Sequence, residues 1–309
     1  MTLADVRPDD ARWIALWNEV WPPLATTPAE ERSWRAVHPG AFVLQEEDGR
    51  VSGGAFAFLE PGLPPGLALG GVLVRVSERG AGRGTALLEL ARARAAALGA
   101  TGLRGHLWIG PDGEGRATLD WAGRAGFAET ARELVVALSL REREPPAVDP
   151  PEGVRIVSWA DDPGLAPQLH AIASEAIPDI PGEEDAVVPP LEEWLRNDMS
   201  GPYDRPEAVL VALAGDEAVG YAKLHLPAAR GDVAVNDLTA VRRTWRGRGV
   251  AGALKRAQLG WAIRNGYTSL ETLNEERNAP IRALNARFGY RPAGTWVRVE
   301  GSTHERAAT

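Results

Sequence analysis

Two short segments of the sequence combine glycine and arginine in the pattern Arg-Gly-x-Gly-x-Gly/Ala. The segments are Arg79-Gly80-Ala81-Gly82-Arg83-Gly84 and Arg246-Gly247-Arg248-Gly249-Val250-Ala251. Glycines let the backbone approach a ligand closely and adopt positive φ angles. If a helix begins at each segment, its first N–H groups and its dipole attract an anion. We therefore predict two sites for a pyrophosphate, with the arginines adding positive charge.

Other phosphate-binding loops fit the sequence less well. The chain contains no G-x-x-x-x-G-K-[ST] segment, which excludes a Walker A loop. Gly247–Gly252 does match G-x-G-x-x-G, and Glu271 follows, so a dinucleotide-binding domain is an alternative. Against it, Arg242–Trp245 separate these glycines from the preceding strand, and Thr85 stands where the first segment needs a third glycine.

Carboxylates near the second segment are candidates for proton transfer. Asp237 lies on the apolar run before that segment, and Glu275 lies at the end of the next predicted strand. A carboxylate at either position would be able to act as a general base. The competing interpretation is that both are solvated surface groups. In the first half, the matching stretch, Trp108–Gly115, is loop-like and has no asparagine, and we expect the site around the first loop to lack acid–base groups.

The elements that must position these residues occur twice along the chain. Each half is predicted to contain a short strand, helical material, a hairpin, a strand, the glycine segment, an amphipathic helix, a strand and a second helix. Four prolines in Arg141–Pro151 predict a semi-rigid linker. We therefore predict domains at residues 1–144 and 153–309, joined by a linker at 145–152.

The composition narrows the possible functions. The chain has 309 residues, a net charge of −8 and no cysteine. The charge argues against binding to nucleic acid or to an anionic membrane, and the absence of cysteine excludes thiolate nucleophiles and disulfides. The histidines lack metal-binding spacing, so no metal is expected. Without a signal peptide or a long apolar run, a cytoplasmic protein is expected. Trp13, Trp17 and Trp21 predict a buried stripe on the first helix.

The two halves resemble GNAT N-acetyltransferases. Val74–Leu88 and Val241–Leu254 resemble motif A of that family, and Gly126-Phe127 and Gly289-Tyr290 resemble the end of its motif B. The tandem arrangement is similar to that of mycothiol synthase-like actinobacterial acetyltransferases. The resemblance implies an α/β (α+β) fold with two GNAT (acyl-CoA N-acyltransferase) domains, each a central mixed sheet flanked by helices.

The resemblance further implies that acetyl-CoA is the co-substrate and lies in a gap between two splayed parallel strands. The implied contacts are Val72, Leu73, Val74, Arg79, Gly80, Ala81, Gly82, Arg83, Gly84 and Thr85 in the first half, and Thr239, Ala240, Val241, Arg246, Gly247, Arg248, Gly249, Val250, Ala251, Asn274, Asn278 and Asn285 in the second. The three asparagines have a competing interpretation as turn and helix-capping residues.

The implied reaction is direct acetyl transfer to a primary amine of a small molecule, by a monomer or homodimer. Many family members protonate the departing thiolate with a tyrosine that precedes the motif B glycine, but Ala122 and Asn285 occupy those positions here. We expect Asp237 and Glu275 to make the second half catalytic. The first half is expected to be non-catalytic, with a loop that still suits coenzyme A. The alternative is an acyl-CoA-binding or sensing protein without activity.

Overall fold

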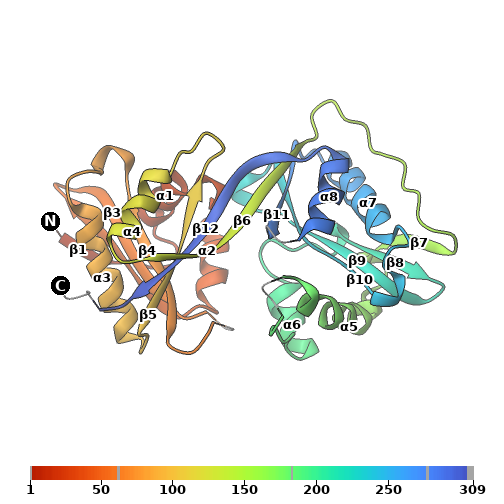
Figure 1. The fold of residues 1–309 in the computed structure, drawn as a ribbon, viewed down its shortest axis with the longest axis horizontal. Helices are drawn as coiled ribbons and strands as arrows, with labels where there is room; N and C mark the ends of the chain where they lie inside the picture. The colour runs from red at the N-terminus through yellow and green to blue at the C-terminus, as the bar shows by residue number, and fades with distance from the viewer. Residues whose placement is uncertain (1, 61–62, 182–183, 276–277, 305–309) are drawn as a thin grey trace. The chain divides into compact units, whose positions relative to one another are not determined.

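The computed structural model describes residues 2–60, 63–181, 184–275 and 278–304, without the side chain of Glu275. The chain divides into two compact units (Figure 1), Met1–Arg132 with Gly294–Thr309, and Glu133–Ala293. This division differs from the predicted boundaries of 1–144, 145–152 and 153–309. The cause is a pair of long strands, β6 (Ala128–Ser139) and β12 (Arg291–Ser302), each of which starts in one unit and ends in the other.

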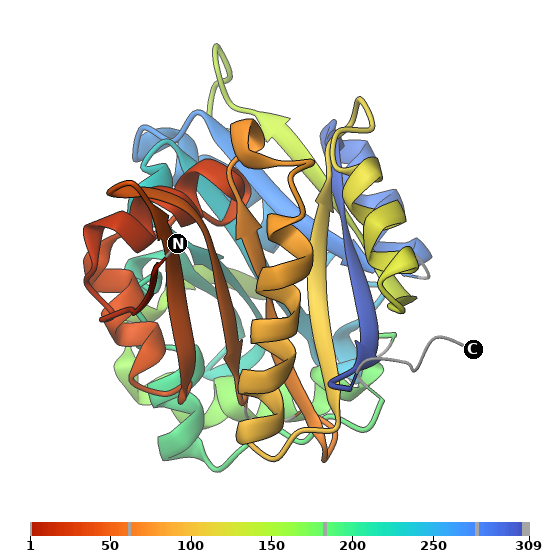
Figure 2. The same cartoon turned by 90° about the vertical axis from the view of Figure 1, so that its left-hand side faces the viewer.

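The first unit is a mixed sheet in the order β1-β2-β3-β4-β5-β12, with helices on its faces. Only β4 and β5 are parallel, whereas the other neighbours are antiparallel. Figure 2 shows α3 across the near face and the C-terminal part of β12 beside β5. Its elements are β1 (Thr2–Asp5), α1 (Ala11–Val20), α2 (Pro28–Arg35), β2 (Gly40–Glu47), β3 (Arg50–Phe58), β4 (Leu67–Val74), α3 (Arg83–Ala97), β5 (Gly102–Ile109) and α4 (Arg116–Arg124).

The second unit repeats this arrangement in the order β7-β8-β9-β10-β11-β6, and only β10 and β11 are parallel. In Figure 1, α7 and α8 lie on one side of this sheet and α5 and α6 on the other. Its elements are β7 (Val154–Ser158), α5 (Ala166–Ala176), η5 (Ile177–Asp179), α6 (Leu191–Asp198), β8 (Val209–Ala214), β9 (Glu217–His225), β10 (Val233–Val241), α7 (Val250–Arg264), β11 (Ser269–Glu275) and α8 (Ala279–Phe288). The predicted α/β class, with two mixed sheets flanked by helices, is confirmed.

Aromatic side chains fill the face of the first sheet that α1 covers. Trp13 is fully buried, and its ring meets those of Phe42 and Phe56 edge-on at centroid distances of 5.6 and 6.2 Å. Trp17 and Trp21 pack against Phe56 from the same helix face and the turn after it. The tryptophan stripe therefore belongs to the core, because recurrence at this spacing places the rings on one side of a helix.

The proline-rich stretch between the two sequence repeats has no regular structure. Residues 145–151 form neither helix nor strand, since proline lacks the N–H that a helix or a sheet ladder requires. The stretch belongs to the second unit and contacts α7, where Arg256 donates to the Asp149 carbonyl at 2.9 Å. No helix in the described residues is long and apolar enough to cross a membrane.

Candidate functional site

A gap opens between the two parallel strands of each unit. In the second unit, pairing of β10 with β11 ends at Asn236 and Thr272, although β10 continues to Val241 and β11 to Glu275. In the first unit, pairing of β4 with β5 ends at Leu69. Strands that stop pairing leave backbone N–H and C=O groups for another partner. Both gaps lie between the parallel strands where the resemblance implies acetyl-CoA.

The glycine loops connect these strands to α3 and α7. Gly80 and Gly82 have φ angles of +83° and +78°, and Gly247 and Gly249 have +75° and +91°. Other residues rarely adopt these angles. Gly82 and Gly249 are the N-caps of their helices, which have no side-chain cap. The N–H groups of each first turn are therefore available to an anion.

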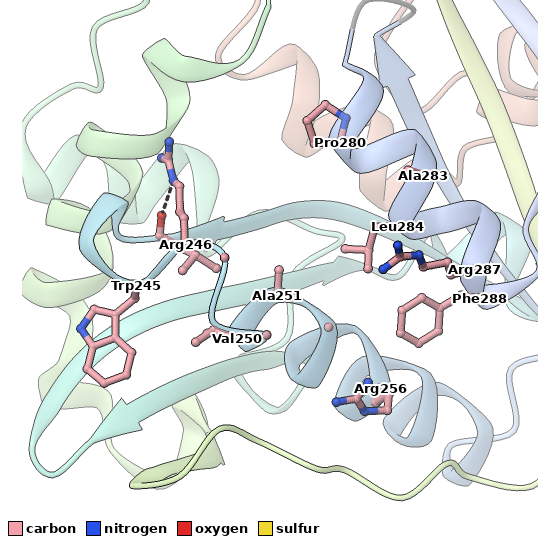
Figure 3. Close-up of a pocket in the computed structure, with 14 residues that line it drawn as sticks. Trp245, Arg246, Val250, Ala251, Arg256, Pro280, Ala283, Leu284, Arg287 and Phe288 are labelled. Atoms are coloured by element: carbon pink, nitrogen blue, oxygen red, sulfur yellow. Dashed lines mark hydrogen bonds between the residues drawn. The ribbon is translucent and has the colours of Figure 1, made fainter.

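A pocket of about 740 Å³ lies beside the second loop (Figure 3), between the first turns of α7 and the facing side of α8. The loop glycines and Ala251 line one wall, whereas Leu284 and Phe288 contribute apolar groups from α8. Three arginines, Arg246, Arg256 and Arg287, also line it. Small residues, exposed helix N–H groups and guanidinium groups form a suitable cradle for a phosphorylated ligand.

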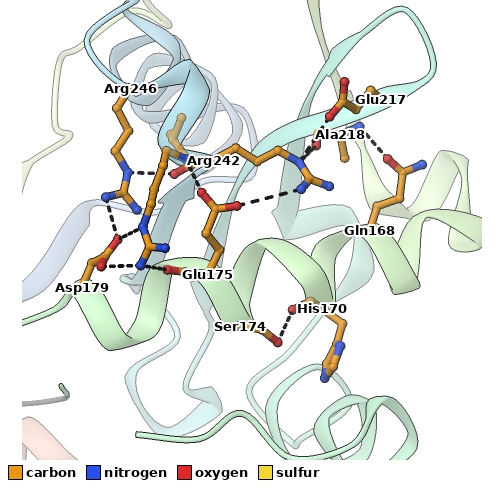
Figure 4. Close-up of polar contacts among 11 residues, drawn as sticks. Gln168, His170, Ser174, Glu175, Asp179, Glu217, Ala218, Arg242 and Arg246 are labelled. Atoms are coloured by element: carbon orange, nitrogen blue, oxygen red, sulfur yellow. Dashed lines mark hydrogen bonds and ion pairs between the residues drawn. The ribbon is translucent and has the colours of Figure 1, made fainter. Parts of the chain in front are cut away.

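The loop arginines play structural parts as well. Arg79 Nε donates to the Val74 carbonyl at 3.2 Å, and Arg246 Nε donates to the Val241 carbonyl at 3.1 Å, so both loops are tied to the preceding strand in the same way. Figure 4 shows Arg246 also paired with Asp179, at 2.7 Å. Hydrogen bonds from Arg243 and Arg246 lower the pKa of Asp179 to about 2. Arg248 lies over the Trp245 ring at 4.9 Å.

A charged group lies on the α5 and α6 side of the sheet, beside the end of the parallel pairing. Asp237 occupies a β-bulge in β10, because Asn236 and Leu238 pair with consecutive residues of β9. Its carboxylate is 3.0 Å from Lys223 Nζ and 3.6 Å from His225 Nε2. A second carboxylate, Asp204, is 3.2 Å from the same histidine nitrogen and 3.5 Å from Lys223 Nζ. We call these four residues the acceptor-side group.

Exposure divides the acceptor-side group into two layers. The side chains of Asp237 and His225 are 36% and 32% exposed, whereas those of Lys223 and Asp204 are 5% and 4% exposed. Burial opposes ionisation of Asp204, yet His225 and Lys223 hold the pKa of its carboxyl below the ordinary value. Burial likewise opposes protonation of Lys223, but Asp237 and Asp204 raise its pKa. The buried pair is thus ionised and holds the exposed pair in position.

A second polar group lies on the α7 side of the same point. Lys255 Nζ donates to Asn236 Oδ1 at 2.8 Å, and Asn236 Nδ2 donates to Gln258 Oε1 at 2.8 Å. Thr272 Oγ1 donates to the Asn236 carbonyl at 3.0 Å, which fixes the group to the last paired position of the parallel strands. All four residues are buried. Burial lowers the pKa of Lys255 to about 8, because the interior solvates an ammonium poorly.

The predicted asparagines hold protein contacts in the structure. Asn285 Nδ2 donates to Asn274 Oδ1 at 2.8 Å, and both residues are buried. Asn278 caps α8 by accepting from the Ile281 N–H at 3.3 Å. Their contact with coenzyme A stays a prediction. The side chain of Glu275, the second predicted base, lies outside the described residues.

The first unit has apolar residues where the second has polar ones. Counted from the loop arginines, the positions of Lys255 and Gln258 are occupied by Leu88 and Ala91, which pack in an apolar cluster. On the opposite face, Phe56 of β3 matches Lys223 by strand register, and Phe58 follows it by two residues as His225 follows Lys223. Equivalent positions of the same helix and strand are thus apolar in the first unit and polar in the second. The shared fold therefore does not require the polar groups.

The phosphate cradle of the first unit also differs. Glu89 stands at the position of Arg256 on the helix after the loop. Trp121 of α4 lies against the first turn of α3, where a Cβ on Gly84 would be 3.5 Å from its ring. Arg83 pairs with the carboxylates of Glu47 and Glu78. The predicted ligand loop Arg79–Thr85 therefore keeps the positive φ angles of its glycines. Its surroundings are more acidic and more crowded than those of the loop in the second unit.

Several of these residues do not stand out from the sequence taken half by half. Lys223 and His225 lie on β9, Lys255 lies on α7, and Asp204 lies in the loop before β8. Alignment of the halves offers the signal that could have revealed three of them, because a charged residue replaces Leu or Phe at a core position. Asp204 has no such signal.

The comparisons with known proteins agree with the geometry. The model of the acetyltransferase (GNAT) family matches residues 10–127 and 169–290. The chain is similar to a tandem GNAT protein from the clavulanic acid biosynthesis pathway, solved without AcCoA, with a TM-score of 0.76 and 20% identity over 99% of each chain. It is also similar to a GCN5-related N-acetyltransferase from Sphaerobacter thermophilus, with a TM-score of 0.73 and 22% identity over 100% of this chain and 97% of the other. A search of curated proteins gives no match.

The family match covers more than half of the chain and includes both glycine loops. It argues against the dinucleotide-binding alternative and supports acyl transfer. Members of this family generally use acetyl-CoA. The likeness to mycothiol synthase-like enzymes stays a prediction. The chain is a tandem acyltransferase that belongs to the GNAT acetyltransferase family.

Proposed function

We propose that the second unit transfers the acetyl group of acetyl-CoA directly to a primary amine of a small molecule. The observation that carries the proposal is the point where β10 and β11 stop pairing, at Asn236 and Thr272. The loop and pocket for a phosphorylated ligand lie beyond the end of β10, and the bulge with Asp237 lies beside that point. One unit thus contains a coenzyme A cradle, a gap and a polar surface for an acceptor.

In this proposal, acetyl-CoA supplies an activated acyl thioester, and the chain supplies its orientation. The N–H groups after Gly249 and the guanidinium groups of Arg256 and Arg287 hold phosphates. The edge of β10 that no longer pairs with β11, from Thr239 to Val241, binds the pantetheine arm in this proposal. These contacts fix the thioester beside the bulge, so that binding energy is used for orientation.

The acceptor amine is held by the acceptor-side group. The exposed carboxylate of Asp237 attracts the ammonium form of the amine, although Lys223 offsets part of its charge. With Nε2 turned to Asp204, His225 has Nδ1 as its basic nitrogen, and we assign the removal of the amine proton to it. The neutral amine then attacks the thioester carbon, the C–N bond forms, and the C–S bond breaks.

The first unit is proposed to be structural. Its aromatic core takes the place of the acceptor-side group, and Glu89 opposes a phosphate where Arg256 favours one. We therefore propose one acetyl-CoA site per chain.

Calorimetric titration with acetyl-CoA and with NAD, followed by thiol release across a panel of amines, tests the proposal. We expect one acetyl-CoA site per chain, no heat with NAD, and thiol release with at least one amine. Binding of acetyl-CoA without thiol release on any amine would favour the alternative of a non-catalytic acyl-CoA-binding protein. A second site would contradict the structural role of the first unit.

Arg256→Glu copies the residue of the first unit into the second. We expect it to raise the Kd for acetyl-CoA at least ~10-fold, since a charge-assisted hydrogen bond is worth about 1.5–3 kcal/mol. Arg256→Met should have a smaller effect, because it removes the attraction without adding repulsion. Titration calorimetry at two salt concentrations measures both, and the difference between the variants should shrink at high salt. Equal affinities for the wild type and Arg256→Glu would remove Arg256 from the site.

A further inference from the structure

The second unit contains an ammonium group that its fold does not require. Lys255 lies on the inner face of α7 and is buried, whereas the matching residue of α3 is Leu88 in an apolar cluster. Burial of an ammonium is unfavourable unless it is paired and hydrogen-bonded. No ion pair of the described residues includes Lys255, whose Nζ donates to Asn236 Oδ1. Residues kept against such a cost are candidates for function.

Lys255 lies beside the point where β10 and β11 stop pairing, which is the proposed place of the reaction. Its partner Asn236 is the last residue of β10 that pairs with β11, and the next residue is the bulged Asp237. Asn236 contacts α7, whereas Asp237 contacts Lys223 and His225 on the opposite face. A thioester held at this point would therefore have the acceptor-side group on one face of the sheet and Lys255 on the other.

Polar groups lie beside Lys255, and none of its contacts in the described part of the chain is with a carboxylate. It donates to Asn236, which is bonded in turn to Gln258 and Thr272, and the centroid of the Tyr290 ring is 5.9 Å from Nζ. Burial raises the pKa of Tyr290, so its phenol stays neutral while Lys255 titrates. Gln258 Nε2 is buried and has no hydrogen-bond partner among the described residues. An ammonium without a carboxylate partner gives up its proton more easily than an ion-paired one.

We propose that Lys255 donates the proton that the coenzyme A thiolate acquires when it leaves, in place of the tyrosine that Asn285 replaces. This inference rests on the proposed acetyl transfer in the second unit. As the amine nitrogen bonds to the acyl carbon, the C–S bond breaks and its electron pair goes to sulfur. The sulfur takes a proton from Lys255 Nζ. His225 passes the ammonium proton to solvent before the attack and then accepts the second proton, which the nitrogen loses as the amide forms; solvent restores both groups. Acid and base thus act from opposite faces of β10.

The first test compares kcat at saturating acetyl-CoA and amine for the wild type, Lys255→Met and Lys255→Arg. A general acid contributes about 10²–10⁴-fold, so we expect both variants to lose about 100-fold in kcat with an unchanged Kd for coenzyme A. Arginine keeps the positive charge but does not release a proton near neutral pH. Restoration of the rate by Lys255→Arg would show that charge alone matters and would overturn the proposal.

The pH profile supplies a readout that a structural role would not change. The donor is the ammonium form, and burial lowers the Lys255 pKa to about 8. The wild-type kcat should therefore fall as the pH rises through about 8, and this alkaline limb should be absent in both variants. Persistence of the limb in Lys255→Met would contradict the assignment.

Lys255→Leu shows whether a lower rate comes from misfolding or from the missing acid. It introduces the residue that the first unit has at this position, Leu88. We expect its Tm to equal or exceed that of the wild type, because a buried charge is replaced by a side chain that the fold accepts. Its kcat should still fall about 100-fold. If the wild type releases no thiol with any amine, the proposed function fails. If the wild type turns over and Lys255→Leu is equally active, only the role of Lys255 fails.

Discussion

Gly249→Val is expected to lower kcat/KM for acetyl-CoA by about 1,000-fold, or ~4 kcal/mol. Gly249 has a φ of +91°, and a β-branched residue is strained there by about 1–3 kcal/mol. Relief of that strain reorients the first N–H groups of α7, which removes hydrogen bonds to a charged ligand worth about 1.5–3 kcal/mol each. Crowding is not the cause, because an added Cβ would meet only Pro151 Cγ, at 3.9 Å.

Gly82→Val is the matched control. Gly82 has a φ of +78° and caps α3 as Gly249 caps α7, so the backbone strain is comparable. If only the second unit catalyses, its kcat/KM should stay within about 2-fold of the wild-type value. Thiol release gives the rates, and thermal melts show whether both variants lose similar stability. Loss of activity with Gly82→Val and not with Gly249→Val would move catalysis to the first unit.

His225→Asn and Asp237→Asn should affect different kinetic constants. Removal of the base is expected to lower kcat by about 10²–10³-fold, because proton transfer from the amine is then left to water. Removal of the Asp237 carboxylate is expected mainly to raise KM for the amine, by about 10-fold, since that group attracts the ammonium before reaction. Steady-state rates over a range of amine concentrations at saturating acetyl-CoA separate the two effects.

His304→Asn is the control for the histidine substitution, because this residue is exposed in the first unit. Its kcat and its KM for the amine should equal those of the wild type. If Asp237→Asn lowers kcat as strongly as His225→Asn, the carboxylate shares the proton transfer, as the sequence alone predicts. If neither variant changes kcat or KM, the acceptor binds elsewhere and the assignment of this surface is wrong.

Features of the site that depend on local sequence were predictable. Positive φ angles at Gly82 and Gly249, helices that start at these glycines, and strands before them follow from residue types within a few positions. The repeat of that pattern in two halves predicts a mixed sheet region in each, and the strands of the two units follow equivalent mixed orders. The tryptophan stripe was predictable for the same reason, because helical spacing alone places its rings on one face.

The acceptor-side group and the Lys255 group were not predictable from a single half. Asp237 meets Lys223 at a bulge in β10 that sets the register against β9, and Asp204 reaches the same lysine from the loop before β8. A strand register depends on pairing across the sheet and on which face is buried. Likewise, a lysine on an amphipathic helix is usually solvated, and only the packing of α7 shows that Lys255 is buried.

By itself, the sequence determined the family, the two glycine loops and the order of elements, because these depend on backbone preferences and hydrophobic periodicity along short segments. Only the tertiary structure decided that compact units cross the sequence halves through β6 and β12, and which charged groups lie on either side of Asn236. These features depend on contacts between residues far apart in the chain, whose free energy is set by burial and strand register rather than by neighbouring residues.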